Sequence, residues 1–273
     1  MGKLRVGIVA FLNSRPLAWG FLEGRYRDLF EASLYPPAEV ARRLAAGELD
    51  IGLIPAIEVQ RIPDLSVLPG LCVAATHEVR SVLLVLKKPL AEVREVALDE
   101  NSRTSAALVK ILFADRWGLA PTYREARPRV EEMLEVADAA LVIGDPALSV
   151  DRERYQILDL AAEWRALTGL PAVFALWAVR PGVELPDLAL YFEDSLRRGL
   201  EAMPELVASA AKELDLPRDE VERYLTEYLS YSLGPDELAA LDAYYRRAAR
   251  LGLIAPPRPL RLWGAHAEAL AAH

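Results

Sequence analysis

The sequence predicts an α/β protein shaped as a two-lobed clamshell, in which one lobe is inserted into the other. Its 273 residues correspond to roughly two domains of about 150 residues each. Short apolar segments alternate with amphipathic ones, which indicates βαβ units and lobes that each hold a mostly parallel sheet flanked by helices. The chain is expected to cross between the lobes twice, over residues 80–85 and 174–179. We therefore expect one lobe to comprise 1–82 and 178–273, the other 83–177, with a ligand cleft between them.

The first lobe is predicted to open with a buried strand over 4–11, because this run is short, apolar and rich in β-branched residues. A helix follows to about Gly24, with Ser14 placed as its N-cap and Pro16 in its first turn. The next elements continue the alternation: a strand near 32–35, a helix over 37–47 and a strand over 51–55.

The inserted lobe is predicted to be a compact α/β module that ends where a long strand over 172–179 returns the chain to the first lobe. Its expected elements are strands at 81–86, 93–98, near 122–125 and at 140–144, with helices at 102–115 and 130–136. After Pro181 the chain is expected to be almost entirely helical, over 185–203, 204–214, 219–229 and 235–251.

The residue inventory excludes several kinds of chemistry. Cys72 is the single cysteine, so the chain has no intramolecular disulfide and no multi-cysteine zinc site. The three histidines are scattered and do not favour a metal site. The net charge of −8 argues against nucleic acid or an anionic membrane as the main partner, but a small anionic ligand remains compatible with it.

Targeting segments are not apparent in the sequence. The apolar run near the N-terminus is only about five residues, shorter than the ~7–15 of a secretory core. No stretch approaches the ~20 apolar residues of a membrane helix. We therefore expect a soluble, cytoplasmic protein.

Polar residues follow the predicted strands at the edge where the cleft is expected. Ligands of open parallel sheets contact loops at the carboxyl ends of strands. This rule selects five loops, at residues 13–15, 55–58, 76–81, 101–105 and 144–146. In the first loop, Asn13, Ser14 and Arg15 offer an amide, a hydroxyl and a guanidinium to an anionic ligand. A turn with an N-cap and a surface arginine explains these three residues equally well.

The segment from Asn101 to Ser105 opens the first helix of the inserted lobe. Ser102, Thr104 and Ser105 supply hydroxyls beside the free backbone N–H groups of a helix N-terminus, which together suit a carboxylate or a phosphate. Ordinary capping by Ser102 is the alternative, although three hydroxyls in one turn exceed what a cap needs. Because the chain is acidic overall, cations that hold an anion must be local, and Arg15 and Arg103 are the candidates.

Two further positions near the cleft each have more than one interpretation. Ser81 can face the cleft while Arg80 faces solvent, because strand side chains alternate, or both can belong to a plain crossing strand. Asp145 follows a strand and can act as a catalytic carboxylate, as an acceptor for a ligand hydroxyl or as the cap of the next turn.

Three loop residues complete the candidates. Gly169 and Leu170 can offer backbone N–H groups to a ligand, or can form a plain turn before the second crossing. His77 is the only histidine near the predicted cleft, where it can serve as a general base. A solvated loop histidine is the commoner outcome for such a position.

Six motifs, taken in order, resemble those of the chorismate dehydratases. Each motif is weak alone, and together they extend from about residue 4 to 180. In this chain they are LNSRPL at 12–17, GELDIGLIP at 47–55, VRSVLL at 79–84, SRTS at 102–105, IGDPAL at 143–148 and GLPAVFA at 169–175.

The resemblance implies a type II periplasmic-binding-protein fold used as a cytoplasmic enzyme of the futalosine route to menaquinone. Members of this family convert chorismate, a dicarboxylate, to 3-[(1-carboxyvinyl)oxy]benzoate and water, with no metal or organic cofactor. By position, Asn13 and Ser81 match the family's active-site asparagine and serine, and residues 102–105 match its loop for the substrate carboxylate. The resemblance also implies that the substrate's enolpyruvyl carboxylate is the base, with Asp145 or His77 as the second possibility.

Other functions on the same fold remain open at this stage. A solute-binding receptor is the main alternative, although we expect such a protein to carry a signal peptide or a lipoprotein cysteine. The sister enzyme 1,4-dihydroxy-6-naphthoate synthase opens with a Pro-Asn-Asp type loop and uses a histidine, where this chain has Asn13-Ser14-Arg15-Pro16. The segment 76–78, Thr-His-Glu, departs from the dehydratase pattern and leaves contacts of that loop in doubt.

Overall fold

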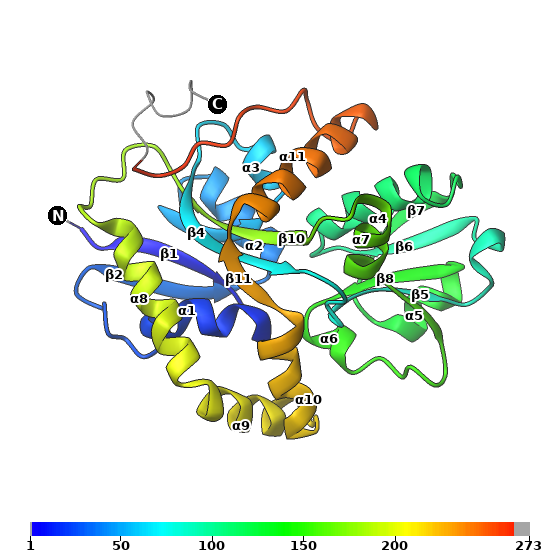
Figure 1. Ribbon diagram of the computed structural model, residues 1–273, viewed down its shortest axis with the longest axis horizontal. Helices are drawn as coiled ribbons and strands as arrows, with labels where there is room; N and C mark the ends of the chain where they lie inside the picture. The colour runs from blue at the N-terminus through cyan, green and yellow to red at the C-terminus, as the bar shows by residue number, and fades with distance from the viewer. Residues whose placement is uncertain (1, 265–273) are drawn as a thin grey trace.

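The computed structural model describes residues 2–264 and consists of two lobes, each built on its own β-sheet (Figure 1). The first sheet contains β1 (Leu4–Val9), β2 (Phe30–Tyr35), β3 (Ile51–Pro55), β4 (Ser66–Ala75), β10 (Ala172–Val179) and β11 (Ser230–Leu233). The second sheet contains β5 (Val82–Leu86), β6 (Glu95–Asp99), β7 (Thr122–Ala126), β8 (Ala139–Ile143) and β9 (Gln156–Asp159). No helix among the described residues is long and apolar enough to cross a membrane.

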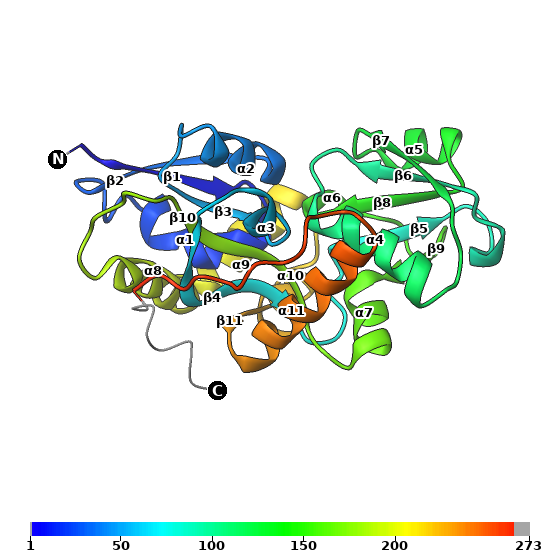
Figure 2. The same cartoon turned by 90° about the horizontal axis from the view of Figure 1, so that it is seen from above.

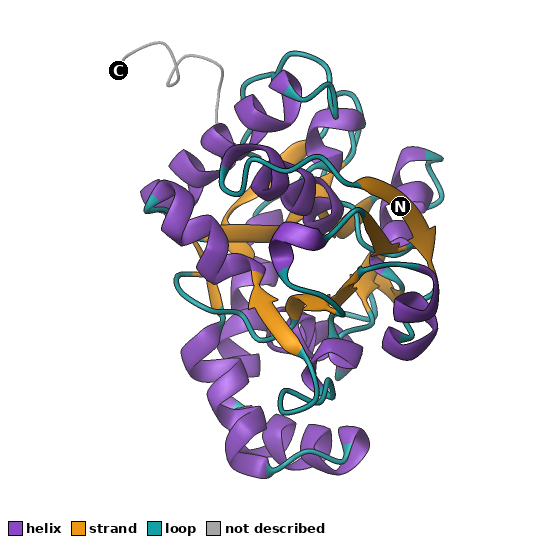
Figure 3. Ribbon diagram, turned by 90° about the vertical axis from the view of Figure 1, so that its right-hand side faces the viewer, coloured by secondary structure: helices purple, strands orange, loops and turns teal. Residues whose placement is uncertain are grey.

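Helices cover both sheets, and the central strands lie inside the molecule while the edge strands β2 and β7 are partly exposed (Figure 3). The first sheet is joined by α1 (Arg15–Leu22), α2 (Pro37–Ala45), α3 (Glu58–Arg61), α8 (Leu188–Glu201), α9 (Met203–Leu214), α10 (Arg218–Arg223) and α11 (Pro235–Arg250). The second is joined by α4 (Thr104–Asp115), α5 (Val130–Val136), α6 (Asp145–Leu148) and α7 (Leu160–Thr168). Three shorter turns are η1 (Leu12–Ser14), η2 (Leu90–Glu92) and the π-helix η3 (Tyr224–Tyr228).

The sheets are mixed, so the prediction of mostly parallel sheets is wrong. In the first sheet β1 runs parallel to β2 and β3, but β10 runs antiparallel to β3 and β4. In the second, β6 runs parallel to β7 and β8, while β5 runs antiparallel to β8 and β9. The physical reason is the crossing between the lobes. β5 and β10 each enter from the other lobe and therefore begin at the cleft edge of their sheet. Their neighbours β8 and β3 end at that edge, so each of these two pairs is antiparallel.

The other elements that sequence reasoning missed are short or flanked by polar residues. β11 has four residues, SYSL, between the helices predicted over 219–229 and 235–251, and it is a strand because it pairs with the edge of β4. β9 and α7 follow each other directly at Asp159, whose carboxylate accepts hydrogen bonds from the N–H groups of Ala161 and Ala162. The remaining expected elements are present, with ends that differ by a few residues.

The two crossings lie at residues 76–81 and 169–171, between the last element of one lobe and the first strand of the other. The whole of β10 belongs to the first sheet. The lobe boundaries expected from the sequence stay a prediction, and strand membership favours moving the second boundary from 177 to about Pro171. Residues 265–273 of the predicted first lobe lie outside the described part of the chain.

Helix α11 lies across both lobes and ties their cleft edges together (Figure 2). Tyr244 donates a hydrogen bond of 2.9 Å to the carbonyl of Thr104 at the start of α4. The next residue, Tyr245, donates one of 2.7 Å to the carbonyl of Ala56, just after β3. The Tyr245 bond holds α11 to its own lobe, and the Tyr244 bond joins it to the other lobe, so separating the lobes at this point would leave a buried hydroxyl unpaired.

Candidate active site

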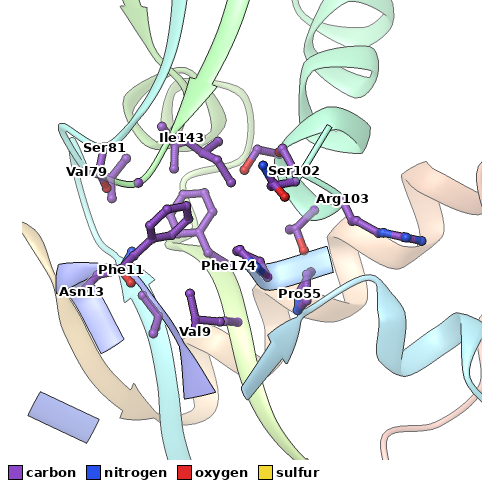
Figure 4. A pocket seen from close by; sticks show the side chains of 18 of the residues that line it. Val9, Phe11, Asn13, Pro55, Val79, Ser81, Ser102, Arg103, Ile143 and Phe174 are labelled. Atoms are coloured by element: carbon purple, nitrogen blue, oxygen red, sulfur yellow. The ribbon is translucent and has the colours of Figure 1, made fainter. Parts of the chain in front are cut away.

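A pocket lies between the two lobes, with about 560 Å³ of space free of protein atoms, part of which is open to solvent (Figure 4). Its walls are mainly apolar, and the aromatic rings of Phe11 and Phe174 lie near its centre in the close view. All five loops selected from the carboxyl-end rule reach it, through Asn13, Pro55, Val79 and Ser81, Asn101 to Ser105, and Gly144. The cleft edge is therefore where the fold gathers its polar side chains.

One polar end of the pocket is formed by Asn13 and Ser81, which lie on the same side in Figure 4. Asn13 sits in the turn η1 directly after β1, and Ser81 lies just before β5. Ser81 is 0% exposed, and its Oγ accepts a hydrogen bond of 2.8 Å from the hydroxyl of Tyr224. The backbone carbonyl of Ser81 accepts a second bond, also 2.8 Å, from the N–H of Gly144.

The other polar end is formed by the loop before α4. Asp99 ends β6, and its carboxylate accepts a hydrogen bond of 2.9 Å from the N–H of Asn101. The N–H of Ser102 bonds to the Asp99 carbonyl at 2.9 Å, which completes the turn. Burial raises the pKa of Asp99, whose carboxyl is turned toward this loop. The turn leaves the first N–H groups of α4 without intrahelical partners, as at any helix N-terminus.

Ser102 carries the clearest sign that this loop meets a ligand. The residue is 7% exposed and lines the pocket, yet its Oγ is buried without a hydrogen-bond partner among the described residues. A buried hydroxyl without a partner costs about 1–3 kcal/mol, and native structures contain few of them. A carboxylate at the end of the pocket would give this hydroxyl an acceptor.

The neighbours of Ser102 play different parts. Thr104 lines the pocket, but its Oγ1 accepts a bond of 3.3 Å from the N–H of Ile57 and so links the lobes. Ser105 is buried and lines the pocket. Arg103 also contributes to the wall, although its guanidinium extends away from the pocket centre in Figure 4 and lies 3.7 Å from the Glu58 carboxylate. The loop therefore presents hydroxyls and N–H groups first and a positive charge at the rim.

The structure does not bring Ser14 and Arg15 into the pocket wall, in contrast to expectation. The Ser14 hydroxyl donates to the carbonyls of Val9 and Phe11 and makes no capping bond to α1. Arg15 pairs with Glu213 of α9 at 2.7 Å. Because successive side chains of a 3-10 turn such as η1 point about 120° apart, the three residues face different sides, and of the three only Asn13 lines the pocket.

Asp145 lies behind the pocket wall, where it joins the lobes. Its carboxylate accepts a hydrogen bond of 2.9 Å from the N–H of Leu12, on the opposite lobe. Burial raises the pKa of Asp145, and the Leu12 N–H and the Arg15 charge oppose that shift. The geometry gives this carboxylate a role in closing the cleft and no contact with the pocket interior.

The remaining candidates also lie outside the wall. Gly169 ends α7 with φ +76°, and its N–H bonds to the carbonyl of Arg165. The N–H of Leu170 bonds to the Thr168 hydroxyl at 3.2 Å, so neither N–H is free for a ligand. His77 is exposed and does not line the pocket.

Sequence reasoning missed three residues that shape the site, Phe11, Phe174 and Tyr224, and selected Gly144 only as part of a cleft loop. Gly144 adopts φ +67° and ψ −148°, and a Cβ at this position would lie 2.6 Å from the Phe11 ring. The available signal was the glycine of the motif IGDP at the end of a strand. Almost only glycine adopts this combination of φ and ψ. Nothing local in the sequence connects Tyr224 to the site, because it lies 143 residues after Ser81.

Arg103 is the only described residue of the pocket wall with an ionisable side chain. The wall thus combines neutral hydrogen-bond donors at two ends with apolar surface between them. Such a pocket can hold a molecule with an anionic group at each end. In a low-dielectric, closed site these placed donors act strongly on charge that develops during a reaction.

Comparisons with known proteins agree on family and fold. A family model described as menaquinone biosynthesis matches residues 4–250. A chorismate dehydratase from Thermus thermophilus is 31% identical over 240 residues, which are 81% of this chain and 86% of that protein. A chorismate dehydratase from Campylobacter jejuni is 26% identical over 254 residues, covering 89% of this chain and 92% of that protein.

Solved structures share the fold at low sequence identity. Protein AF1704 from Archaeoglobus fulgidus superposes with a TM-score of 0.71 at 18% identity, covering 92% of this chain and 98% of that one. The alkanesulfonate-binding protein SsuA from Xanthomonas axonopodis pv. citri superposes with a TM-score of 0.69 at 20% identity, covering 93% and 94%. These likenesses confirm the predicted two-lobed periplasmic-binding-protein fold and do not bear on the ligand.

Proposed function

Because the chain belongs to the menaquinone biosynthesis family, we propose that it is a chorismate dehydratase, converting chorismate to 3-[(1-carboxyvinyl)oxy]benzoate and water. The observation that carries this proposal is the pocket with two polar ends, Asn13 and Ser81 at one and the loop 102–105 at the other. Chorismate has two carboxylates joined by an apolar ring and an enol ether, which matches this arrangement. We place the ring carboxylate on the loop before α4 and the enolpyruvyl carboxylate on Asn13 and Ser81.

The ring carboxylate is the group on which negative charge develops. Loss of the C3 proton, which is vinylogous to this carboxylate, spreads charge into it while the C4–O bond breaks. The unpaired hydroxyl of Ser102 and the first N–H groups of α4 are placed to stabilise that charge. Formation of the aromatic ring supplies the driving force, so the protein needs mainly to hold and orient the substrate.

The base is assigned to the substrate itself. The described wall offers no carboxylate, histidine, lysine or tyrosine, and both Asp145 and His77 lie outside it. An enolpyruvyl carboxylate held by Asn13 and Ser81 would take the C3 proton and return it to the departing C4 hydroxyl, which then leaves as water. Atoms and charge balance in this scheme without a further reactant. Closure of the lobes over the substrate, together with the Phe11 and Phe174 rings, would exclude bulk water from the step.

Incubation of the purified protein with chorismate tests the proposal. We expect conversion to the enolpyruvyl benzoate, identified by mass and by its aromatic proton spectrum. Ser81→Ala and Asn13→Asp are each expected to remove most of the turnover. Absence of product, combined with tight binding of another solute, would favour the receptor function; conversion of a naphthoate precursor would favour the sister synthase.

We further assign the reaction to the futalosine route and the protein to the cytoplasm, on the basis of the six-motif resemblance. Restoration of menaquinone in a strain that lacks its own chorismate dehydratase, together with recovery of the protein in the cytoplasmic fraction, is the expected result. Recovery with the periplasmic fraction would contradict the assignment.

A further inference from the structure

Tyr224 is a fully buried tyrosine that touches the polar end formed by Asn13 and Ser81. It begins the π-helix η3, which follows α10 on the first lobe. Single π-helical turns are rare and occur frequently at functional sites, because the wider turn re-aims a side chain. Here the turn places the Tyr224 hydroxyl 2.8 Å from Ser81 Oγ, across 143 residues of sequence.

Two hydroxyls share this hydrogen bond, and with the neutral Tyr224 hydroxyl as its donor the bond limits what Ser81 can do. A serine hydroxyl has one proton to donate and two lone pairs with which to accept. Tyr224 donates into one lone pair of Ser81 Oγ. The backbone of Ser81 is held at the same time by the Gly144 N–H. The proton of Ser81 is therefore left for the pocket, where the substrate carboxylate is expected.

The groups around Tyr224 keep its hydroxyl protonated. Burial raises the pKa of Tyr224, the nearby carboxylates of Asp145 and Asp159 raise it further, and hydrogen bonding with Ser81 and Asn13 opposes the shift. The side chain of Asn13 thus also faces this hydroxyl. A neutral tyrosine hydroxyl at this point is both a donor to Ser81 and a fixed dipole behind the two residues that hold the substrate.

We propose that Tyr224 is a positioning residue, which holds the Ser81 hydroxyl as a donor toward the enolpyruvyl carboxylate of the substrate. This inference rests on the proposed function, because the group that Ser81 addresses is a carboxylate of chorismate. Tyr224 does not line the pocket and acts through Ser81. Without Tyr224, Ser81 would rotate freely and the carboxylate that takes the C3 proton would lose its fixed orientation.

Tyr224→Phe tests the inference, with Tyr231→Phe as the matched control. Tyr231 is also buried, in the neighbouring strand β11, but its hydroxyl has no hydrogen-bond partner among the described residues. We expect Tyr224→Phe to lower kcat about tenfold or more with a smaller change in KM, because orientation is lost while the pocket keeps its shape. Tyr231→Phe is expected to keep wild-type kcat.

A double-mutant cycle with Ser81→Ala separates positioning from a general structural effect. If Tyr224 acts through Ser81, Tyr224→Phe has little further effect on kcat in the Ser81→Ala background. An equal fall in both backgrounds, or wild-type kcat for Tyr224→Phe, would overturn the inference. Wild-type protein is measured in the same assay: no turnover there would refute the proposed function and this inference with it, whereas an active wild type isolates the role of Tyr224.

Discussion

Replacement of Ser102 by alanine should change stability and activity in opposite directions. In the free protein the Ser102 hydroxyl is buried without a partner among the described residues, which costs about 1–3 kcal/mol of desolvation. Alanine removes that cost together with one packed oxygen atom, so the free energy of unfolding is expected to stay equal or to rise by up to about 1 kcal/mol. For a chain of this size that corresponds to a rise in Tm of roughly 0–4 °C.

The same change removes a donor to the ring carboxylate. A hydrogen bond to a charged group contributes about 1.5–3 kcal/mol, which corresponds to a fall in kcat/KM of about 10- to 140-fold. Thermal unfolding without ligand and steady-state kinetics with chorismate measure the two effects on one preparation. A clear fall in Tm would mean that the hydroxyl has a structural partner, and unchanged kinetics would mean that it does not meet the substrate; either result refutes the reasoning.

Ser195 provides a matched control for this experiment. It is also a buried serine, at 0% exposed, but its Oγ accepts a hydrogen bond of 3.0 Å from the N–H of Gly20 and thereby joins α8 to α1. Ser195→Ala removes this link between the helices and is expected to lower the free energy of unfolding by about 0.5–1.5 kcal/mol while kcat/KM is unchanged. The pair of variants thus separates a hydroxyl that serves the fold from one that serves the ligand.

Three further predictions follow from the same geometry. Gly144→Ala should cost about 1–3 kcal/mol of backbone strain and drive Cβ into the Phe11 ring, so both stability and affinity for chorismate fall; wild-type values by chemical denaturation and titration would contradict this. Arg15→Gln should change kcat/KM less than about twofold, because Arg15 pairs with Glu213 outside the pocket; a tenfold loss would place it at the substrate. The kcat profile should be flat from about pH 6 to 9 and fall only as the substrate carboxylates protonate near their ordinary pKa of about 3–4, since burial keeps Tyr224 protonated throughout; a step near pH 7 would indicate a protein base.

The sequence predicted the two-lobed fold and part of the site because both depend on local patterns. Short apolar runs in the sequence predict buried strands. Residues that directly follow those strands, such as Asn13 and Ser102, are thereby placed at the cleft edge. The direction of an individual side chain depends on packing that local patterns do not contain. Ser14 follows Asn13 by one residue, yet its hydroxyl turns back to the Val9 carbonyl, because η1 inserts one tight turn before α1.

Contacts between segments that are far apart in the sequence account for most of the features of the fold and site that local patterns did not predict. Asp145 has the pattern of a cap or a catalytic residue, but the approach of the other lobe makes it the acceptor for the Leu12 N–H. Tyr224 lies in a segment that has the periodicity of an ordinary helix, and its importance appears only when η3 is placed against Ser81. The antiparallel course of β5 and β10 likewise follows from entry at the cleft edge, which only the assembled lobes define.

The central claim is that one pocket between the lobes holds the two carboxylates of the substrate at two separate polar ends. A crystal structure of the protein with 3-[(1-carboxyvinyl)oxy]benzoate bound tests it most directly. The account predicts the ring carboxylate on the Ser102 hydroxyl and the first N–H groups of α4, with the carboxyvinyl carboxylate on Asn13 and Ser81. Electron density for the product in the reversed orientation, or outside the cleft, would contradict it.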